Sequence, residues 1–568
     1  MKISEISIHN YRSISDGKVK LGSYSSIVGP NSAGKSNFIR SILQFYDYEG
    51  FKYNKEFDFP RFNVDDKDTW IDIEYKLPDS EYSTLDKKYR LPDNKMKLRR
   101  KLESKPLHGY RGTELSTDAF YGYANVSKAK IGDVIYIPAV PDSEEAFKFS
   151  GPSAVRDSIE KIIGKILNES NELKSINENL KKYIESIGNK TNEDGNTLNS
   201  FIDRINESMK SMNMEFLLNT GEVKSDIIIK SLFSVRLKDT LLGQEVDKES
   251  IGTGQLRQLF YNIIRIYREI SVSRPNDDTQ NSIFSPKLNL LLFEEPEAYL
   301  HPPQQVALNK ALKDIAKNEN WQVVITSHSP VFLSKDTADL TKIARFQRDQ
   351  MGKTQIFQVT KETIDDLLTG STALINFLKS KKSEEGMSKS LISDIDRVLS
   401  GTIPDLDEFR YQSFLDRERA SAFFTDKVII CEGKSDKLLI EYILEKNNLD
   451  EHGIYALDSL GKYNLHRFME LFKQFGIKHI VMYDSDENKP DKVPYLLNDF
   501  IENMKNSTTI STIKIPKDLE SQLKVEIPNN RDDLKPLMVL KQIKEKGIED
   551  LKNLENLILE NIKKLEEQ

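Results

Sequence analysis

The segment GPNSAGKS, from Gly29 to Ser36, determines how the rest of the chain is interpreted. Its spacing is G-x-x-x-x-G-K-[ST], it follows a predicted strand at residues 26–28, and it precedes a predicted helix at residues 37–45. A loop in this setting directs backbone N–H groups and a helix N-terminus at phosphate oxygens. The sequence therefore predicts a nucleotide-binding loop that includes Gly29, Asn31 and Gly34. Lys35 is expected to reach the β- and γ-phosphates of ATP, and Ser36 to bind Mg²⁺.

A second predicted strand, at residues 288–293, is largely apolar and ends in the pair Glu294-Glu295. Two carboxylates then lie at the carboxyl end of a strand, where the metal ion and the attacking water are found in nucleotide hydrolysis. The pair resembles that of the ABC class of ATPases, in which the first acid supports Mg²⁺ and the second is the general base. This resemblance assigns those roles to Glu294 and Glu295, although Glu294 stands where Asp is usual.

Further motifs resemble those of the ABC and SMC-like ATPases. Residues 251–255, IGTGQ, resemble the signature that caps the γ-phosphate of a partner subunit, through Gly252, Gly254 and Gln255. Residues 326–330, TSHSP, resemble the switch-histidine loop, with His328 as the sensor. Residues 10–13, NYRS, resemble an early arginine motif, so Arg12 is expected to contact a phosphate. The resemblance implies a dimer, because the signature of one subunit completes the P-loop site of another.

A helical hairpin is predicted to interrupt the ATPase. Apolar residues recur at intervals of three, four or seven, the pattern of an amphipathic helix: Ile159, Ile162, Ile166, Leu173, Ile176, Leu180, Ile184 and Ile187. A loop at 188–196 and a second helix at 198–214 follow. We place this insert at 152–216, between ATPase parts at 1–151 and 217–359. Its apolar stripe favours self-association, and a DNA-facing arm is the alternative.

A second α/β unit is predicted at residues 421–568, after a helical connector at 360–420. Glu432 follows an apolar strand and precedes Asp436, and Asp484 and Asp486 follow a later strand. The carboxyl ends of neighbouring parallel strands meet in one crevice. Carboxylates gathered there repel one another, and a divalent cation relieves the repulsion. Oxygen ligands favour Mg²⁺ or Mn²⁺, and no His or Cys cluster accompanies them for zinc.

The order and spacing of these acids resemble the Toprim fold. With the ATPase ahead of it, nearly the whole chain resembles the OLD (overcoming lysogenization defect) family of nucleases, which includes the nuclease subunit of the Gabija defence system. In that family the Toprim acids bind two metal ions for phosphodiester hydrolysis. The resemblance assigns Glu432 and Asp436 to one ion, and Asp484 and Asp486 to the other. It makes Glu520 a further ligand and Lys535 the residue that steadies the transition-state charge. Asp436 stands where the family usually has Glu.

The resemblance implies a DNA endonuclease that binds ATP and Mg²⁺ or Mn²⁺, forms a homodimer and acts in anti-phage defence, with a helicase or another defence protein as a possible partner. The alternative is an SMC-like DNA-binding clamp whose Toprim domain is not catalytic. A primase or topoisomerase fits less well, because the chain lacks a Cys-rich zinc module and an evident cleavage-tyrosine domain.

Length and composition agree with this interpretation. A chain of 568 residues is expected to form two or three domains, because single cores stop growing near roughly 250 to 300 residues. The one cysteine, Cys431, excludes a disulfide framework. No stretch approaches the ~20 apolar residues of a membrane span, and the N-terminal residues lack the core of a signal peptide. We therefore expect a soluble, cytoplasmic protein.

The net charge of −7 does not exclude nucleic acid, since local basic patches determine that affinity. One basic run has two interpretations, a phosphate-contacting patch or a solvated edge strand: Lys95, Lys97, Arg99, Arg100 and Lys101.

Overall fold

The computed structural model describes residues 1–104, 106–122, 130–139, 171–188, 190, 197–209, 284–333, 340–528, 531–546 and 552–567, with short stretches between 214 and 266. The chain divides into two compact units. The first comprises Met1–Asp47, Phe51–Val134 and Asn281–Gln568, and the second comprises Tyr48–Gly50 and Ile135–Gln280. No helix of the described residues is long and apolar enough to cross a membrane.

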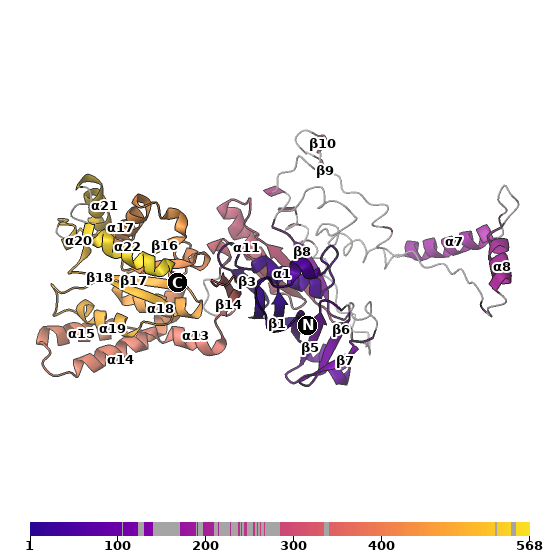
Figure 1. Ribbon diagram of the computed structural model, residues 1–568, viewed down its shortest axis with the longest axis horizontal. Helices are drawn as coiled ribbons and strands as arrows, with labels where there is room; N and C mark the ends of the chain where they lie inside the picture. Colours follow the sequence, from indigo (N-terminus) through magenta and orange to yellow (C-terminus); the bar gives the residue numbers. More distant parts are fainter. Residues whose placement is uncertain are drawn as a thin grey trace. The chain divides into compact units, whose positions relative to one another are not determined.

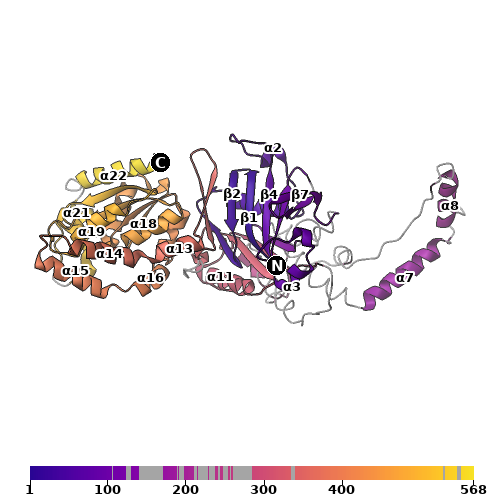
Figure 2. The same ribbon diagram turned by 90° about the horizontal axis from the view of Figure 1, so that it is seen from below.

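An antiparallel sheet opens the first unit (Figure 2). Its strand order is β2-β1-β4-β5-β6-β7. The strands are β1 (Lys2–Tyr11), β2 (Ile14–Lys20), β4 (Trp70–Lys76), β5 (Lys95–Lys101), β6 (Leu107–Arg111) and β7 (Glu114–Ala119). Two short helices lie along this part of the chain, α2 (Lys55–Asp58) and α3 (Asp79–Thr84).

The basic run forms β5, which is an interior strand and not an edge strand. Four of its five cations pair with carboxylates of the neighbouring strand and loop. Arg99 lies directly opposite Asp72, with Nε 2.6 Å from Oδ1, and Lys97 Nζ lies 3.1 Å from the same carboxylate. Lys95 pairs with Glu74 and Lys101 with Asp68. The edge-strand interpretation is therefore wrong, and the phosphate-contacting interpretation stays a prediction.

A second sheet carries the nucleotide motifs. Its order is β14-β13-β3-β12-β11-β8. The strands are β3 (Tyr24–Val28), β8 (Asp133–Ile137), β11 (Asn289–Glu294), β12 (Trp321–Thr326), β13 (Ile343–Arg348) and β14 (Thr354–Gln358). β3 is buried along its whole length, although it includes two serines, and it runs parallel to β12 and β13. The helices α1 (Lys35–Phe45) and α11 (Pro302–Ala316) follow β3 and β11.

The C-terminal sheet is wholly parallel, with the order β16-β15-β17-β18. The strands are β15 (Lys427–Cys431), β16 (Ile454–Asp458), β17 (Lys478–Asp484) and β18 (Thr509–Ile515). Its helices are α17 (Lys434–Lys446), α18 (Leu465–Gln474), α19 (Val493–Asn503), α20 (Leu519–Gln522), α21 (Lys535–Lys546) and α22 (Lys552–Glu566). The alternation of strand and helix from residue 427 to 484 agrees with the prediction.

Alternate residues of β15 enter two different cores. Ile429 and Cys431 pack with residues of α17, α21 and α22. Val428 and Ile430 pack with residues of α18 and α19 on the other face. Both views show α21 and α22 on one side of this sheet and α14 and α15 on the other (Figures 1 and 2). The strand is therefore buried on both faces, which explains its continuous apolar sequence.

The region predicted as a helical connector is helical, and it packs against the C-terminal sheet. Its helices are α13 (Lys361–Leu368), α14 (Gly370–Lys382), α15 (Lys389–Gly401) and α16 (Asp407–Phe414). Leu374, Ile395 and Phe414 belong to the same core as Val428 and Phe468. These helices therefore form part of one layer of the C-terminal domain.

The second unit contains α7 (Asn171–Gly188), α8 (Leu198–Met209) and the short strands β9 (Leu237–Lys238) and β10 (Glu245–Val246). α7 and α8 contact each other, as expected of a hairpin. Leu173 is buried, whereas Ile176 on α7 and Phe201 on α8 are exposed. Ile159, Ile162 and Ile166 lie outside the described residues.

Candidate functional site

The P-loop has the backbone that its glycines allow. Gly29 has φ 135° and Gly34 has φ 105°, both in the region that L side chains rarely adopt. A Cβ at Gly29 would lie 2.0 Å from the carbonyl oxygen of Phe346, and one at Gly34 would lie 2.4 Å from Thr354 Oγ1. The loop therefore fits closely against β13 and β14, and neither glycine has room for a side chain.

Lys35 opens α1 and is buried. Its Nζ donates hydrogen bonds to the carbonyl oxygens of Gly29 at 2.9 Å and Pro30 at 2.7 Å, so the ammonium lies over the loop. Burial lowers its pKa to about 8, opposed by the charges of Glu295 and Glu297. Asn31 and Ser36 are exposed on the loop and at the start of the helix.

The acids predicted for hydrolysis lie at the end of β11. Glu294 is buried. Glu295 takes a left-handed conformation with φ 43°, and its N–H donates to the Thr326 carbonyl at the end of β12. His328 Nε2 lies 3.9 Å from Glu295 Oε1. Burial lowers the pKa of His328 to about 4, with Lys35 adding to the effect, so the imidazole is neutral at pH 7. The structure thus brings Lys35, Glu295 and His328 together.

Glu297 is a residue of this site that the sequence did not single out. Its carboxylate accepts from Ser327 Oγ at 2.9 Å and from the His328 N–H. Burial raises its pKa, and these hydrogen bonds oppose the shift. Glu297 therefore holds the loop that carries His328. Its position in the run of residues 294–302 was the only available signal.

Arg12 pairs with an acid in this structure, and the signature motif is described only in part. Arg12 Nε donates to Asp58 Oδ1 at 2.8 Å. It lines a cavity of about 450 Å³ with Ser13, Asn37, Arg61, Phe62 and Arg348. Ile251, Gly252 and Thr253 lie outside the described residues, while Gly254 and Gln255 are described and have helical backbone.

The second site is a cavity of about 790 Å³ at the ends of the C-terminal strands. It is lined by five of the predicted residues: Glu432, Asp436, Asp484, Glu520 and Lys535. They come from the ends of β15 and β17 and from α17, α20 and α21. Glu432 Oε1 accepts from the Asp484 N–H at 2.8 Å, and Asp484 Oδ1 accepts from the Leu519 N–H at 3.1 Å. These bonds fix two carboxylates at adjacent strand ends.

The carboxylates of this cavity are poorly compensated. Burial, with the charges of the neighbouring acids, raises the pKa of Asp484 to about 9 and that of Asp436 to about 7. Burial likewise raises the pKa of Glu432 to about 7, although Lys462 opposes the shift. A hard divalent cation suits such a set of oxygen donors. In this structure, no group of three or more His, Cys, Asp or Glu side chains among the described residues is arranged to hold a metal ion.

Asp486 is set apart from the other four acids. It is buried, does not line the cavity, and pairs with Lys462 Nζ at 2.8 Å. Lys462 was missed by sequence reasoning, because a single lysine in the loop after β16 belongs to no motif that we recognised. The ion pair of Arg419 with Asp458 at the cavity wall was missed for the same reason.

Known families match both parts of the chain. The AAA ATPase domain family matches residues 1–131 and 93–333. The TOPRIM domain of overcoming lysogenization defect protein-like proteins matches residues 423–486.

Relatives match across nearly the full length. Endonuclease GajA of Bacillus cereus (strain VD045) is 24% identical over 566 residues, covering 94% of this chain and 84% of that protein. Old nuclease of Escherichia phage P2 is 23% identical over 592 residues, covering 96% and 91%. Among solved structures, the SmcHead bound to the C-winged helix domain of ScpA has a TM-score of 0.39 at 13% identity, covering 64% of this chain and 100% of that one.

The predicted fold class, α/β with a P-loop ATPase ahead of a Toprim domain, is thereby confirmed. The two domains occur in the predicted order, and the full-length relatives share the predicted family. The chain therefore belongs to the AAA ATPase domain family, and it carries an OLD-like Toprim domain and resembles nucleases over nearly its full length.

Proposed function

We propose that this chain is an ATP-binding, divalent-metal-dependent DNA endonuclease in which the ATPase regulates cleavage at the Toprim cavity. The observation that carries the proposal is the cavity itself. Four carboxylates and Lys535, from five separate segments, line one space, and the pKa values of three of the acids are raised. Such a group of acids needs cations, and two cations form a phosphodiester-cleaving arrangement.

Each residue then has a role. Glu432 and Asp436 would hold one ion and Asp484 and Asp486 the other, with Glu520 as a further ligand. When bound, Mg²⁺ or Mn²⁺ would lower the pKa of the attacking water and neutralise charge on the leaving oxygen. Lys535 would steady the charge that develops on the phosphate. In the ATPase, Lys35 and Ser36 would bind the phosphates and Mg²⁺, Glu294 would support that Mg²⁺, and Glu295 would activate water.

The test is a plasmid incubated with the purified protein and Mg²⁺ or Mn²⁺, with and without ATP. Nicked or linear product that EDTA prevents is the expected result. A protein that binds DNA and never cuts it with either metal would instead be the SMC-like clamp.

Regulation by nucleotide is supported by Arg345, which joins the two domains of the first unit. Arg345 lies on β13 opposite Val28, the residue before the P-loop. Its side chain is fully buried and donates to the carbonyl oxygens of Phe423, Thr425 and Phe475, which flank β15 and β17. A movement of the P-loop strand therefore has a direct path to the Toprim strands.

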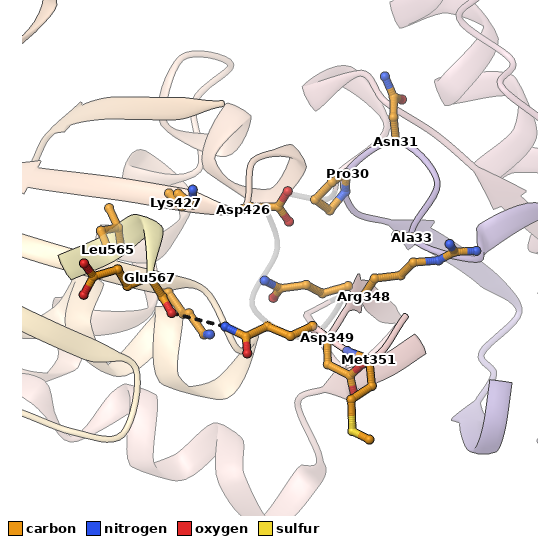
Figure 3. A pocket seen from close by; sticks show the side chains of 13 residues that line it. Pro30, Asn31, Ala33, Arg348, Asp349, Met351, Asp426, Lys427, Leu565 and Glu567 are labelled. Atoms are coloured by element: carbon orange, nitrogen blue, oxygen red, sulfur yellow. Dashed lines mark hydrogen bonds between the residues drawn. The ribbon is translucent and has the colours of Figure 1, made fainter. Parts of the chain in front are cut away.

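A cavity of about 690 Å³ lies beside this connection (Figure 3). Pro30, Asn31 and Ala33 of the P-loop line it together with Lys427 and Lys478, the first residues of β15 and β17. Gln350 Nε2 donates to the carbonyl oxygen of Glu567 across it, at 3.2 Å. The outer face of the P-loop thus borders the Toprim domain directly.

Arg345→Met is expected to retain ATP binding and to lose the effect of ATP on cleavage. The methionine fills similar space but donates no hydrogen bonds to the Toprim carbonyls. The measurement is the ratio of cleavage rates with and without ATP, which should move to about one. Arg111→Met, at an exposed position of β6 where the arginine pairs with Asp118, is the control and should keep the wild-type ratio. A folded Arg345→Met protein with an unchanged ratio would exclude this path.

Self-association is proposed through the helical insert, with the signature of one copy completing the ATP site of another. Light scattering at micromolar concentration should give a dimer or larger species, because the exposed apolar residues of α7 and α8 favour burial. A monomer both with and without ATP would contradict this expectation.

The remaining assignments are proposals of the same kind. We propose domain boundaries at 1–151, 152–216, 217–359, 360–420 and 421–568. We further propose a cytoplasmic role in anti-phage defence, with DNA as substrate and a helicase or another defence protein as partner. Both named relatives are nucleases, which supports the choice of substrate.

A further inference from the structure

Lys462 is a buried cation among the strand-end carboxylates of the Toprim domain. It is 4% exposed. Its Nζ lies 2.8 Å from Asp486 Oδ2 and 3.7 Å from Glu432 Oε1, and it donates to the main-chain oxygen of Asp484. A buried ammonium is costly unless it is paired and hydrogen-bonded. Here the partners come from the ends of both β15 and β17.

The loop that carries Lys462 is tied to the backbone of Glu432. The Gly461 N–H donates to the Glu432 carbonyl at 2.7 Å, and Ser459 Oγ donates to the same oxygen at 3.3 Å. Gly461 has φ 106°, a conformation that favours glycine. The ammonium is therefore held in a fixed position relative to Glu432.

The negative charge of Asp486 is already balanced by neighbouring lysines. It is 7% exposed and has φ 51°, and its N–H donates to the Lys517 carbonyl at 2.8 Å. Its Oδ2 pairs with Lys462, and its Oδ1 lies 3.9 Å from Lys489 Nζ. Asp486 thus faces two ammonium groups, while Glu432, Asp436, Asp484 and Glu520 line the cavity.

We propose that Lys462 is a positioning residue that stands beside Glu432 and pairs with Asp486 in the place of a divalent ion, and thereby sets how many ions the Toprim site binds tightly. The ion that Glu432 and Asp436 would hold then binds tightly. A second ion must compete with Lys462 for Asp486, so it binds weakly in the absence of DNA. This inference rests on the proposed metal-dependent function.

The test is Mn²⁺ binding by the full-length protein, measured from the paramagnetic resonance signal of free Mn²⁺. The wild type should show one tight Toprim ion, identified by its loss in Glu432→Gln. Lys462→Met removes the competing charge, so the second ion should bind at least about tenfold more tightly. The matched control is Lys437→Met. Lys437 lines the same cavity but pairs with Glu418 and Glu441, so its removal should leave the second ion weak.

Two further variants keep the inference testable if Lys462→Met does not fold. Lys462→Arg keeps the charge and should keep one tight ion. Asp486→Asn should leave the tight ion in place, because Asp486 is engaged by Lys462; loss of the tight ion would overturn the inference.

Failure of this inference can be distinguished from failure of the proposed function. Mn²⁺ binding by the wild type with an unchanged second ion in Lys462→Met overturns only the role of Lys462. Absence of Toprim Mn²⁺ binding in the wild type and in Lys462→Met alike would overturn both.

Discussion

Replacing Asp484 by Asn is expected to abolish DNA cleavage and to leave ATP hydrolysis unchanged. The substitution keeps the size of the side chain and an oxygen for the Leu519 N–H, and it removes the charge from the cavity. Loss of a partner outside the ligand shell already costs about 10- to 100-fold, so loss of a proposed ligand should cost at least about a hundredfold. Plasmid cleavage in Mg²⁺ or Mn²⁺, measured beside the ATPase rate of the same preparation, checks both expectations.

The control for this variant is Asp499→Asn, the same chemical change at an exposed position of α19 in the same domain. It should cut DNA at the wild-type rate. Glu432→Gln should lose cleavage as Asp484→Asn does. If Asp484→Asn cuts as well as the wild type, the Toprim cavity is not the nuclease site.

The stability of the metal-free protein separates a catalytic effect from a folding defect. The pKa of Asp484 is raised to about 9, mainly by burial, from an ordinary value of 3.8. An acid with a higher pKa in the folded state costs stability as pH rises from its unfolded value to its folded value, here from about 4 to about 9. Asn does not titrate, so the melting temperature of Asp484→Asn in EDTA should exceed that of the wild type at pH 8. A large decrease would assign a structural role to Asp484.

The strand-end residues could be predicted because they follow from local sequence. β3, β11, β15 and β17 each contain apolar residues, and each ends at, or directly before, the residues assigned to chemistry. Parallel pairing then brings these ends to one edge of each sheet, whatever the loops between them do. The motif and the strand alone were therefore enough to predict the positions of Lys35, Glu295, Glu432 and Asp484.

The residues that connect these motifs could not be predicted in the same way. Arg345 acts through carbonyl oxygens 78 to 130 residues away, and a carbonyl leaves no signal in a sequence. Lys462 meets Asp486 across 24 residues, from a loop with no recognised pattern. The basic run of β5 led to a wrong edge-strand prediction for a related reason. Its charges were visible, but the facing acid Asp72 became a partner only through strand pairing.

Replacing Lys35 by Ala is expected to abolish ATP binding, because it removes the buried ammonium that lies over the P-loop. Glu295→Gln should bind ATP and hydrolyse it at least about a hundredfold more slowly, since a general base contributes about 10²- to 10⁴-fold. Binding of a fluorescent ATP analogue and release of phosphate measure the two effects separately. Lys310→Ala, an exposed lysine on α11, is the control and should change neither. If Lys35→Ala hydrolyses ATP at the wild-type rate, the assignment of the nucleotide site to this loop is wrong.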